Sequence, residues 1–141
     1  MRRFVGPGLG LLLGGVVAFP AAAQRSPDAP TFALEEPRPH PVLPVALVPF
    51  SITPEVCQRG HVPRVALRVY NGIAQPVATL RLRDRRTAIL DSIPLRCGRY
   101  VALWDGSIDG GTRAAPPGIY WLSLSVDDGP TKVRRVIVTP P

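Results

Sequence analysis

The side chains able to do chemistry are few and lie far apart in this sequence. It contains two cysteines, Cys57 and Cys97, and two histidines, His40 and His61. A hydrolase needs a nucleophile, a base and an orienting group that converge, whereas His40 lies in a proline-rich segment and His61 in an expected turn. A zinc site would need further ligands at short spacing from a cysteine, and neither histidine has that spacing. We therefore predict a protein that is not an enzyme and has no metal or cofactor.

The cysteine count predicts a disulfide between Cys57 and Cys97. An even number of cysteines in an exported chain is typical of structural disulfides, because the compartment is oxidising. This bond would close a loop of about 40 residues and stabilise the fold by on the order of 4 kcal/mol. The alternative is a pair of separately buried thiols.

Four aspartates in two polar loops are the remaining candidate ligands: Asp105, Asp109, Asp127 and Asp128. Clustered carboxylates and loop carbonyls are the ligands that calcium prefers. Their spacing does not match an EF-hand loop, so we interpret them as turn residues and keep a calcium site as the alternative.

The N-terminus has the pattern of a secretory signal peptide over residues 1–23. Arg2 and Arg3 precede an uncharged, apolar stretch over 4–19, and Ala21-Ala22-Ala23 provides a small-residue cleavage site. The strongly apolar part, 9–19, is shorter than the roughly 18 residues that span a bilayer. We expect cleavage before Gln24 and a periplasmic or secreted bacterial protein with no transmembrane segment. An uncleaved anchor is the alternative.

The segment 24–49 is predicted to be a proline-rich leader, because its seven prolines forbid a helix and favour extended structure. Its apolar end, 42–50, is compatible with an edge strand. Loss of Arg2 and Arg3 leaves 15 of the 17 basic residues against 10 acidic ones, a net charge of +5. That surface favours anionic partners such as envelope polymers, while export and the lack of interleaved aromatic residues disfavour nucleic acid.

Residues 50–141 alternate apolar and polar side chains in short runs separated by turn residues. This pattern predicts an all-β fold, an immunoglobulin-like antiparallel β-sandwich of about seven strands. A hairpin is expected from 64–70 and 76–83 around Asn71-Gly72. A bulge is expected near Arg134-Arg135, because Val133 and Val136 cannot share a face of an unbroken strand. The expected inward residues are Val65, Leu67, Val69, Ala78, Leu80, Leu82, Tyr120, Leu122, Leu124 and Val126.

The segment 98–120 resembles a known module. Its strand 98–104 ends in Trp104-Asp105-Gly106, a polar turn with further glycines follows, and Pro117-Gly118-Ile119-Tyr120 opens the next strand. This arrangement is similar to the immunoglobulin-like domain of the flagellar hook-capping protein FlgD, which recurs near the C-termini of secreted bacterial proteins. The resemblance covers about 63–138 and implies the fold, but it does not specify a function.

The same motif residues have physical roles of their own. Trp104 is expected to fill the core at a strand end, and Asp105-Gly106 to reverse the chain while the carboxylate accepts backbone amides. Gly118 allows a conformation or a close approach that a side chain would block. Tyr120 is expected to bury its ring and to donate its hydroxyl to a backbone carbonyl, as in a tyrosine corner.

Two surfaces are candidates for binding. Trp121 projects opposite to the inward Leu122, so it marks a platform for a protein or a sugar ring, unless the leader covers it. Arg68, Arg81 and Arg83 are expected to share an outward face as a basic stripe, with an ordinary solvated face as the alternative. The sequence therefore predicts an interaction or structural module that binds a protein of the cell envelope. A carbohydrate- or envelope-polymer-binding protein is the alternative.

Overall fold

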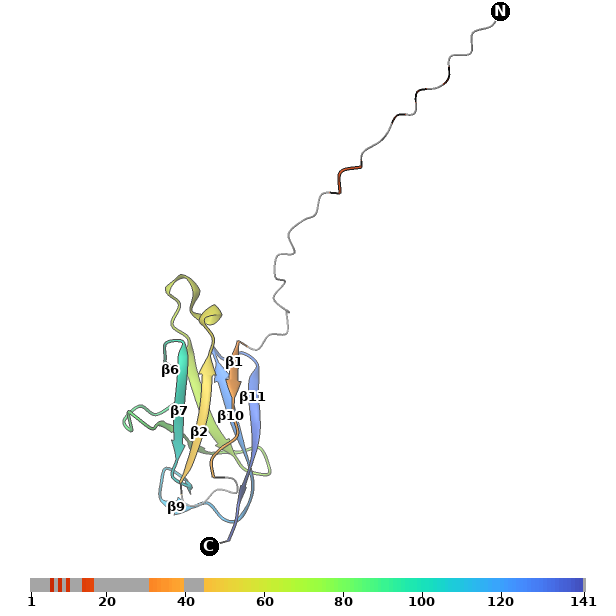
Figure 1. Ribbon diagram of the computed structural model, residues 1–141. Coiled ribbons are helices and arrows are strands. Elements are labelled where there is room, and N and C mark those ends of the chain that lie inside the picture. The colour runs from red at the N-terminus through yellow and green to blue at the C-terminus, as the bar shows by residue number, and fades with distance from the viewer. Residues whose placement is uncertain are drawn as a thin grey trace, which may run out of the picture.

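The computed structural model describes residues 6, 8, 10, 14–16, 31–39 and 45–140, and nearly all of its regular structure is β-strand (Figure 1). A single short 3-10 element, η1, spans Pro54–Gly60. The strands are β1 Phe32–Leu34, β2 Ala46–Ile52, β3 Arg64–Tyr70, β4 Pro76–Thr79, β5 Arg81–Leu82, β6 Ile93–Pro94, β7 Gly98–Trp104, β8 Ser107–Ile108, β9 Arg113–Ala114, β10 Gly118–Val126 and β11 Thr131–Val138.

The strands form two antiparallel sheets with the order of an immunoglobulin domain. One sheet runs β1-β2-β7-β5, and the other runs β11-β10-β3-β4, with β6 also paired to β3. If the strands are lettered in the immunoglobulin manner, these orders read A-B-E-D and G-F-C-C′. A small separate hairpin joins β8 and β9. The predicted all-β sandwich is therefore confirmed.

The core lies between the two sheets and is built from alternate residues of each strand. Val65, Leu67 and Val69 of β3 are fully buried, as the alternation predicted. On the facing sheet, the Phe50 ring stacks on Tyr100 with centroids 5.4 Å apart. Burial of these side chains is the main stabilising term, and the strongest alternation in the sequence therefore marks the core. The predicted inward residues of β10 are also buried: Tyr120, Leu122, Leu124 and Val126.

The sandwich begins earlier than residue 50, the predicted boundary of the domain. Both β1 and the first half of β2 lie inside the predicted leader, and β2 is central, between β1 and β7. Proline is tolerated at Pro49 because its carbonyl accepts the amide of Glu35, just beyond the end of β1. Its nitrogen therefore faces the end of β1 rather than β7, and the ladder to β7 loses no donor.

The expected second strand of the hairpin, 76–83, is divided between the two sheets. β4 pairs with β3, whereas β5 pairs with β7 in the other sheet. The chain crosses at Leu80, which is fully buried and donates its amide to the Leu67 carbonyl. Leu80 and Leu82 are buried and Ala78 is partly buried, which confirms the three predicted inward residues. The crossing between the sheets was not predicted.

The predicted bulge in β11 is wrong. Pairing between β10 and β11 is continuous from Gly118↔Val138 to Ser125↔Thr131. Val136 is buried, whereas Val133 is on the outer face and 51% exposed. The inward positions near the start of β11 are occupied instead by Lys132 and Arg134. The Nε atom of Arg134 donates to the Leu34 carbonyl at 2.8 Å, so that a charged residue closes the side of the sandwich.

The N-terminal predictions lie mostly outside the described residues. These include nearly all of the predicted signal peptide, 1–23, and part of the leader. Among the residues that are described, no helix is long and apolar enough to cross a bilayer.

Candidate functional site

The disulfide predicted between Cys57 and Cys97 is present. Cys57 lies in η1 and Cys97 directly precedes β7, with their Cα atoms 6.1 Å apart. The Cys97 amide also donates to Cys57 Sγ at 3.1 Å. The bond fastens the η1 connection to one end of the β1-β2-β7-β5 sheet. The alternative of two buried thiols is wrong, because no described cysteine is free.

A structural corner forms where β7 ends and β10 begins. Trp104 is 2% exposed, and its indole Nε1 donates to the Ser107 carbonyl at 2.9 Å. Its ring lies 5.9 Å from that of Tyr120, whose hydroxyl donates to the Pro116 carbonyl at 2.6 Å. This is the tyrosine-corner geometry expected at the start of an immunoglobulin F strand. Gly118, with φ at 153°, supplies a backbone conformation that other residues rarely adopt.

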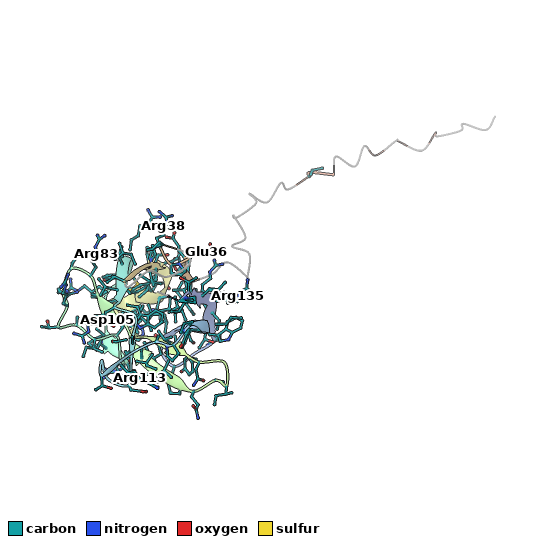
Figure 2. All side chains as sticks on the ribbon, turned by 90° about the horizontal axis from the view of Figure 1, so that it is seen from below. Glu36, Arg38, Arg83, Asp105, Arg113 and Arg135 are labelled. Atoms are coloured by element: carbon teal, nitrogen blue, oxygen red, sulfur yellow. A yellow bond between two sulfur atoms is a disulfide. The ribbon has the colours of Figure 1, made fainter. Side chains whose placement is uncertain are left out.

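The Asp105 carboxylate organises the turn after Trp104. Its Oδ1 accepts the Ser107 hydroxyl and also the Ser107 amide, the latter at 2.9 Å. Gly106, with φ at 77°, completes the chain reversal. The hydrogen bond from the Ser107 hydroxyl, together with that from its amide, holds the pKa of Asp105 below its ordinary value of 3.8. Figure 2 shows Asp105 on the opposite side of the sandwich from Arg135.

Stability at acid pH is expected to depend on Asp105. Since its folded-state pKa is depressed, its contribution is present above pH 3.8 and is lost as pH falls through the folded-state value. Asp105→Ala is expected to lower the free energy of unfolding by roughly 1 kcal/mol at pH 7, with a gap to wild type that narrows below pH 3.8. Urea titrations between pH 7 and pH 2 measure that gap. A gap that stays constant would contradict the assignment, and Asp84→Ala controls for loss of an exposed carboxylate.

Two of the other candidate calcium ligands, Asp109 and Asp127, are also engaged in local contacts. Asp109 Oδ2 lies 2.8 Å from Arg113 Nη2. Asp127 Oδ2 lies 2.7 Å from His61 Nε2, and its Oδ1 accepts the Arg64 amide at 2.9 Å. Within the described ranges, no group of three or more His, Cys, Asp or Glu residues is placed to hold a metal ion. The turn interpretation therefore accounts for these contacts.

The contact between His61 and Asp127 was not predicted from the sequence. It joins the loop after η1 to the β10–β11 turn, and both side chains are substantially exposed. The hydrogen bond from His61, with that from the Arg64 amide, lowers the pKa of Asp127. The two residues lie 66 positions apart, so no local pattern in the sequence could indicate that they meet.

Trp121 lies on the outer face of the β11-β10-β3-β4 sheet and is 38% exposed. Its cross-strand neighbours are Tyr70 on β3 and Arg135 on β11. Two residues away on the same face, Ile119 is 50% exposed and pairs with Ile137. We call the outward apolar residues of this face the Trp121 patch: Tyr70, Ile119, Trp121, Val133 and Ile137.

The patch is hollowed beside the tryptophan, and the described part of the leader does not cover it. A hollow of about 280 Å³ is lined by Tyr70, Trp121, Ser123 and Val133, together with the loop after β3. The described leader strand, β1, belongs to the other sheet. The patch therefore presents a shallow apolar surface with a basic residue, Arg135, on it.

The three arginines predicted to form one basic stripe lie on two different sheets. Arg68 is on β3 and forms an ion pair with Asp91, which raises the pKa of Arg68. Arg81 and Arg83 follow the crossing at Leu80, on β5 and just beyond it. Arg68 and Arg81 still line one polar groove of about 410 Å³.

Arg83 lies elsewhere. It lines a separate hollow with Arg85 and Arg99, and in Figure 2 it lies on the same side of the sandwich as Arg38 and Glu36. The three arginines therefore do not form a single stripe. Arg68 and Arg81 lie in a groove that also contains aspartates, and Arg83 lies in a separate hollow.

The chain was also compared with known proteins. No family model, no curated protein and no solved structure matches it.

Proposed function

We propose that this protein is a non-catalytic interaction module, exported to the cell envelope, that binds a protein partner through the Trp121 patch. We further propose that it belongs with the FlgD-type immunoglobulin-like modules, on the strength of the Trp104-Asp105-Gly106 and Pro117-Gly118-Ile119-Tyr120 segments. The single observation that carries the binding proposal is the exposure of Trp121 on a sheet face that also exposes Ile119 and Val133.

The chemistry of the Trp121 patch is that of a protein-binding surface. Tryptophan and tyrosine are enriched where a few residues supply most of the binding energy. Ile119 and Val133, each about half exposed, enlarge the apolar area around Trp121. Exposed apolar side chains gathered on one face, among polar and charged residues, are typical of interaction sites.

Trp121→Ala is expected to remove most of the affinity. Loss of a central aromatic side chain costs about 2 kcal/mol or more, or roughly thirtyfold in affinity. The measurement is capture of envelope proteins by the mature wild-type and variant chains, with quantitative mass spectrometry. Val62→Ala is the matched control, since Val62 is 43% exposed but precedes β3, at the opposite end of that strand from Tyr70. Equal capture by wild type and Trp121→Ala would contradict the proposal.

A carbohydrate- or envelope-polymer-binding protein is the second candidate. The hollow beside Trp121 favours this function. The indole ring can stack on a sugar, while the adjacent Ser123 hydroxyl can accept a hydrogen bond from it or donate one to it. Binding to a glycan array that disappears in Trp121→Ala, without capture of any protein, would select this function instead.

A further inference from the structure

The described sheets have one long edge with no hydrogen-bonded neighbouring strand, and β1 of the other sheet only approaches its first half. The edge strands β1 and β5 have only three and two residues. The edge of β4 is occupied, because the Asp109 amide donates to the Val77 carbonyl. β11 has eight residues and pairs only with β10. Unpaired backbone groups along such an edge are a template for another strand.

The register identifies which backbone groups of β11 are open. The Asp127 amide donates to the Arg64 carbonyl, so the odd-numbered residues of β10 are directed toward β3 and the even-numbered ones toward β11. Leu122 and Arg134 are therefore a hydrogen-bonded pair. It follows that the amides and carbonyls of Val133, Arg135 and Ile137 point away from β10.

These open positions belong to the same surface as the Trp121 patch. Backbone direction and side-chain face alternate together along a strand, and Val133 projects on the outer face, as its exposure shows. A strand added at β11 would thus continue the outer face on which Trp121 lies. Its alternate side chains would rest beside Val133 and Ile137.

The charges of β11 restrict which strand can be added. The strand contains Lys132, Arg134 and Arg135 and no acidic residue. Lys132 and Arg134 are inward at the edge, Lys132 with its Nζ 5.9 Å from the Phe32 ring centroid. Inward-pointing charges protect an edge against unspecific pairing. A second copy of β11 would bring like charges side by side, which is unfavourable.

We propose that an extended acidic segment of the partner protein pairs with β11 as an added strand, with carboxylates on its inward face that meet Lys132 and Arg134. The inference rests on the proposed function, in that the ligand is a protein, and adds how that protein is held. Main-chain hydrogen bonds to Val133, Arg135 and Ile137 would supply affinity, and the opposite charges would supply specificity.

Two synthetic peptides test this on the mature protein. Both alternate valine with a charged residue over eight positions, one with glutamate and one with lysine. We expect the glutamate peptide to bind about tenfold more tightly by fluorescence anisotropy. Its binding should also slow hydrogen exchange at the amides of Val133, Arg135 and Ile137. Binding of both peptides with equal affinity, or of neither, would overturn the inference.

A proline substitution isolates the backbone contribution. Val133→Pro removes one open amide while leaving the ladder to β10 intact, because that nitrogen faces away from β10. We expect about tenfold weaker binding of the glutamate peptide, whereas Val133→Ile, which keeps both the amide and an apolar side chain, should bind within about threefold of wild type. Circular dichroism checks that both variants fold.

The same variants separate the two proposals. Loss of envelope-protein capture in Trp121→Ala with full capture in Val133→Pro would leave the proposed function standing and overturn strand addition. A dimer of the mature protein in sedimentation experiments that Val133→Pro converts to a monomer would identify a second copy as the occupant, and it too would overturn the inference.

Discussion

Trp104→Ala is expected to lower the free energy of unfolding by about 3–5 kcal/mol, since truncation of a buried aromatic ring leaves a cavity. The ring is 2% exposed, packs against Tyr120 and donates to the Ser107 carbonyl. Its removal empties the corner at which β7 ends and β10 begins. Urea unfolding followed by circular dichroism measures the loss.

Two variants control for the size and position of the Trp104 side chain. Trp104→Phe keeps most of the ring and loses the indole donor, so a smaller loss of about 1–2 kcal/mol is expected. Trp121→Ala removes the same side chain from the surface, where a change of less than about 1 kcal/mol is expected. If Trp104→Ala were no more destabilising than Trp121→Ala, the assignment of Trp104 to the core would be wrong.

Loss of the disulfide is the second large effect. In Cys57→Ala/Cys97→Ala, the free energy of unfolding is expected to fall by on the order of 4 kcal/mol, because the unfolded chain is no longer closed over the intervening segment. The bond joins two residues that lie 40 positions apart in the sequence, and it fastens η1 to the start of β7. Thermal and urea unfolding of the oxidised wild type and the double variant give the difference.

Two further measurements bear on the disulfide. Mass spectrometry of the purified protein without reductant should show a peptide that contains Cys57 linked to one that contains Cys97. Reduced wild type should match the double variant in stability. Two free thiols in the purified protein, or equal stability of the oxidised protein and the variant, would contradict a structural role.

Local alternation was sufficient to identify which side chains enter the core. The pattern over Val65, Leu67 and Val69 is enough to predict the buried face of β3, and all three side chains are buried. The same reasoning placed Trp121 outside and Tyr120 inside. Such predictions succeed because the side-chain period of a strand is two, whatever its neighbours are.

Long-range choices could not be predicted in the same way. Alternation continues unbroken through Leu80, where the chain leaves one sheet for the other, because both sheets direct the apolar side chains to one shared core. Pro49 indicated an edge or a linker, whereas its position opposite the end of β1 lets a central strand accept it. These outcomes depend on which strands meet.

Arg134 shows that a tertiary contact can place a charged side chain at an inward position of a strand. The sequence predicted a bulge near Arg134-Arg135, yet β11 is unbroken and Arg134 occupies an inward position at the edge of the sandwich. There its Nε atom reaches the Leu34 carbonyl on β1. This partner lies 100 residues earlier in the chain, so no local pattern could indicate the contact.

Site-specific photo-crosslinking in the native envelope tests most directly whether a partner binds the outer face of the β11-β10-β3-β4 sheet. A photoreactive amino acid placed at Ile119, on the Trp121 patch, should give a discrete protein adduct. The same residue placed at Leu47, which lies on β2 in the other sheet, should give none. Adducts from Leu47 alone, or from neither position, would contradict the account.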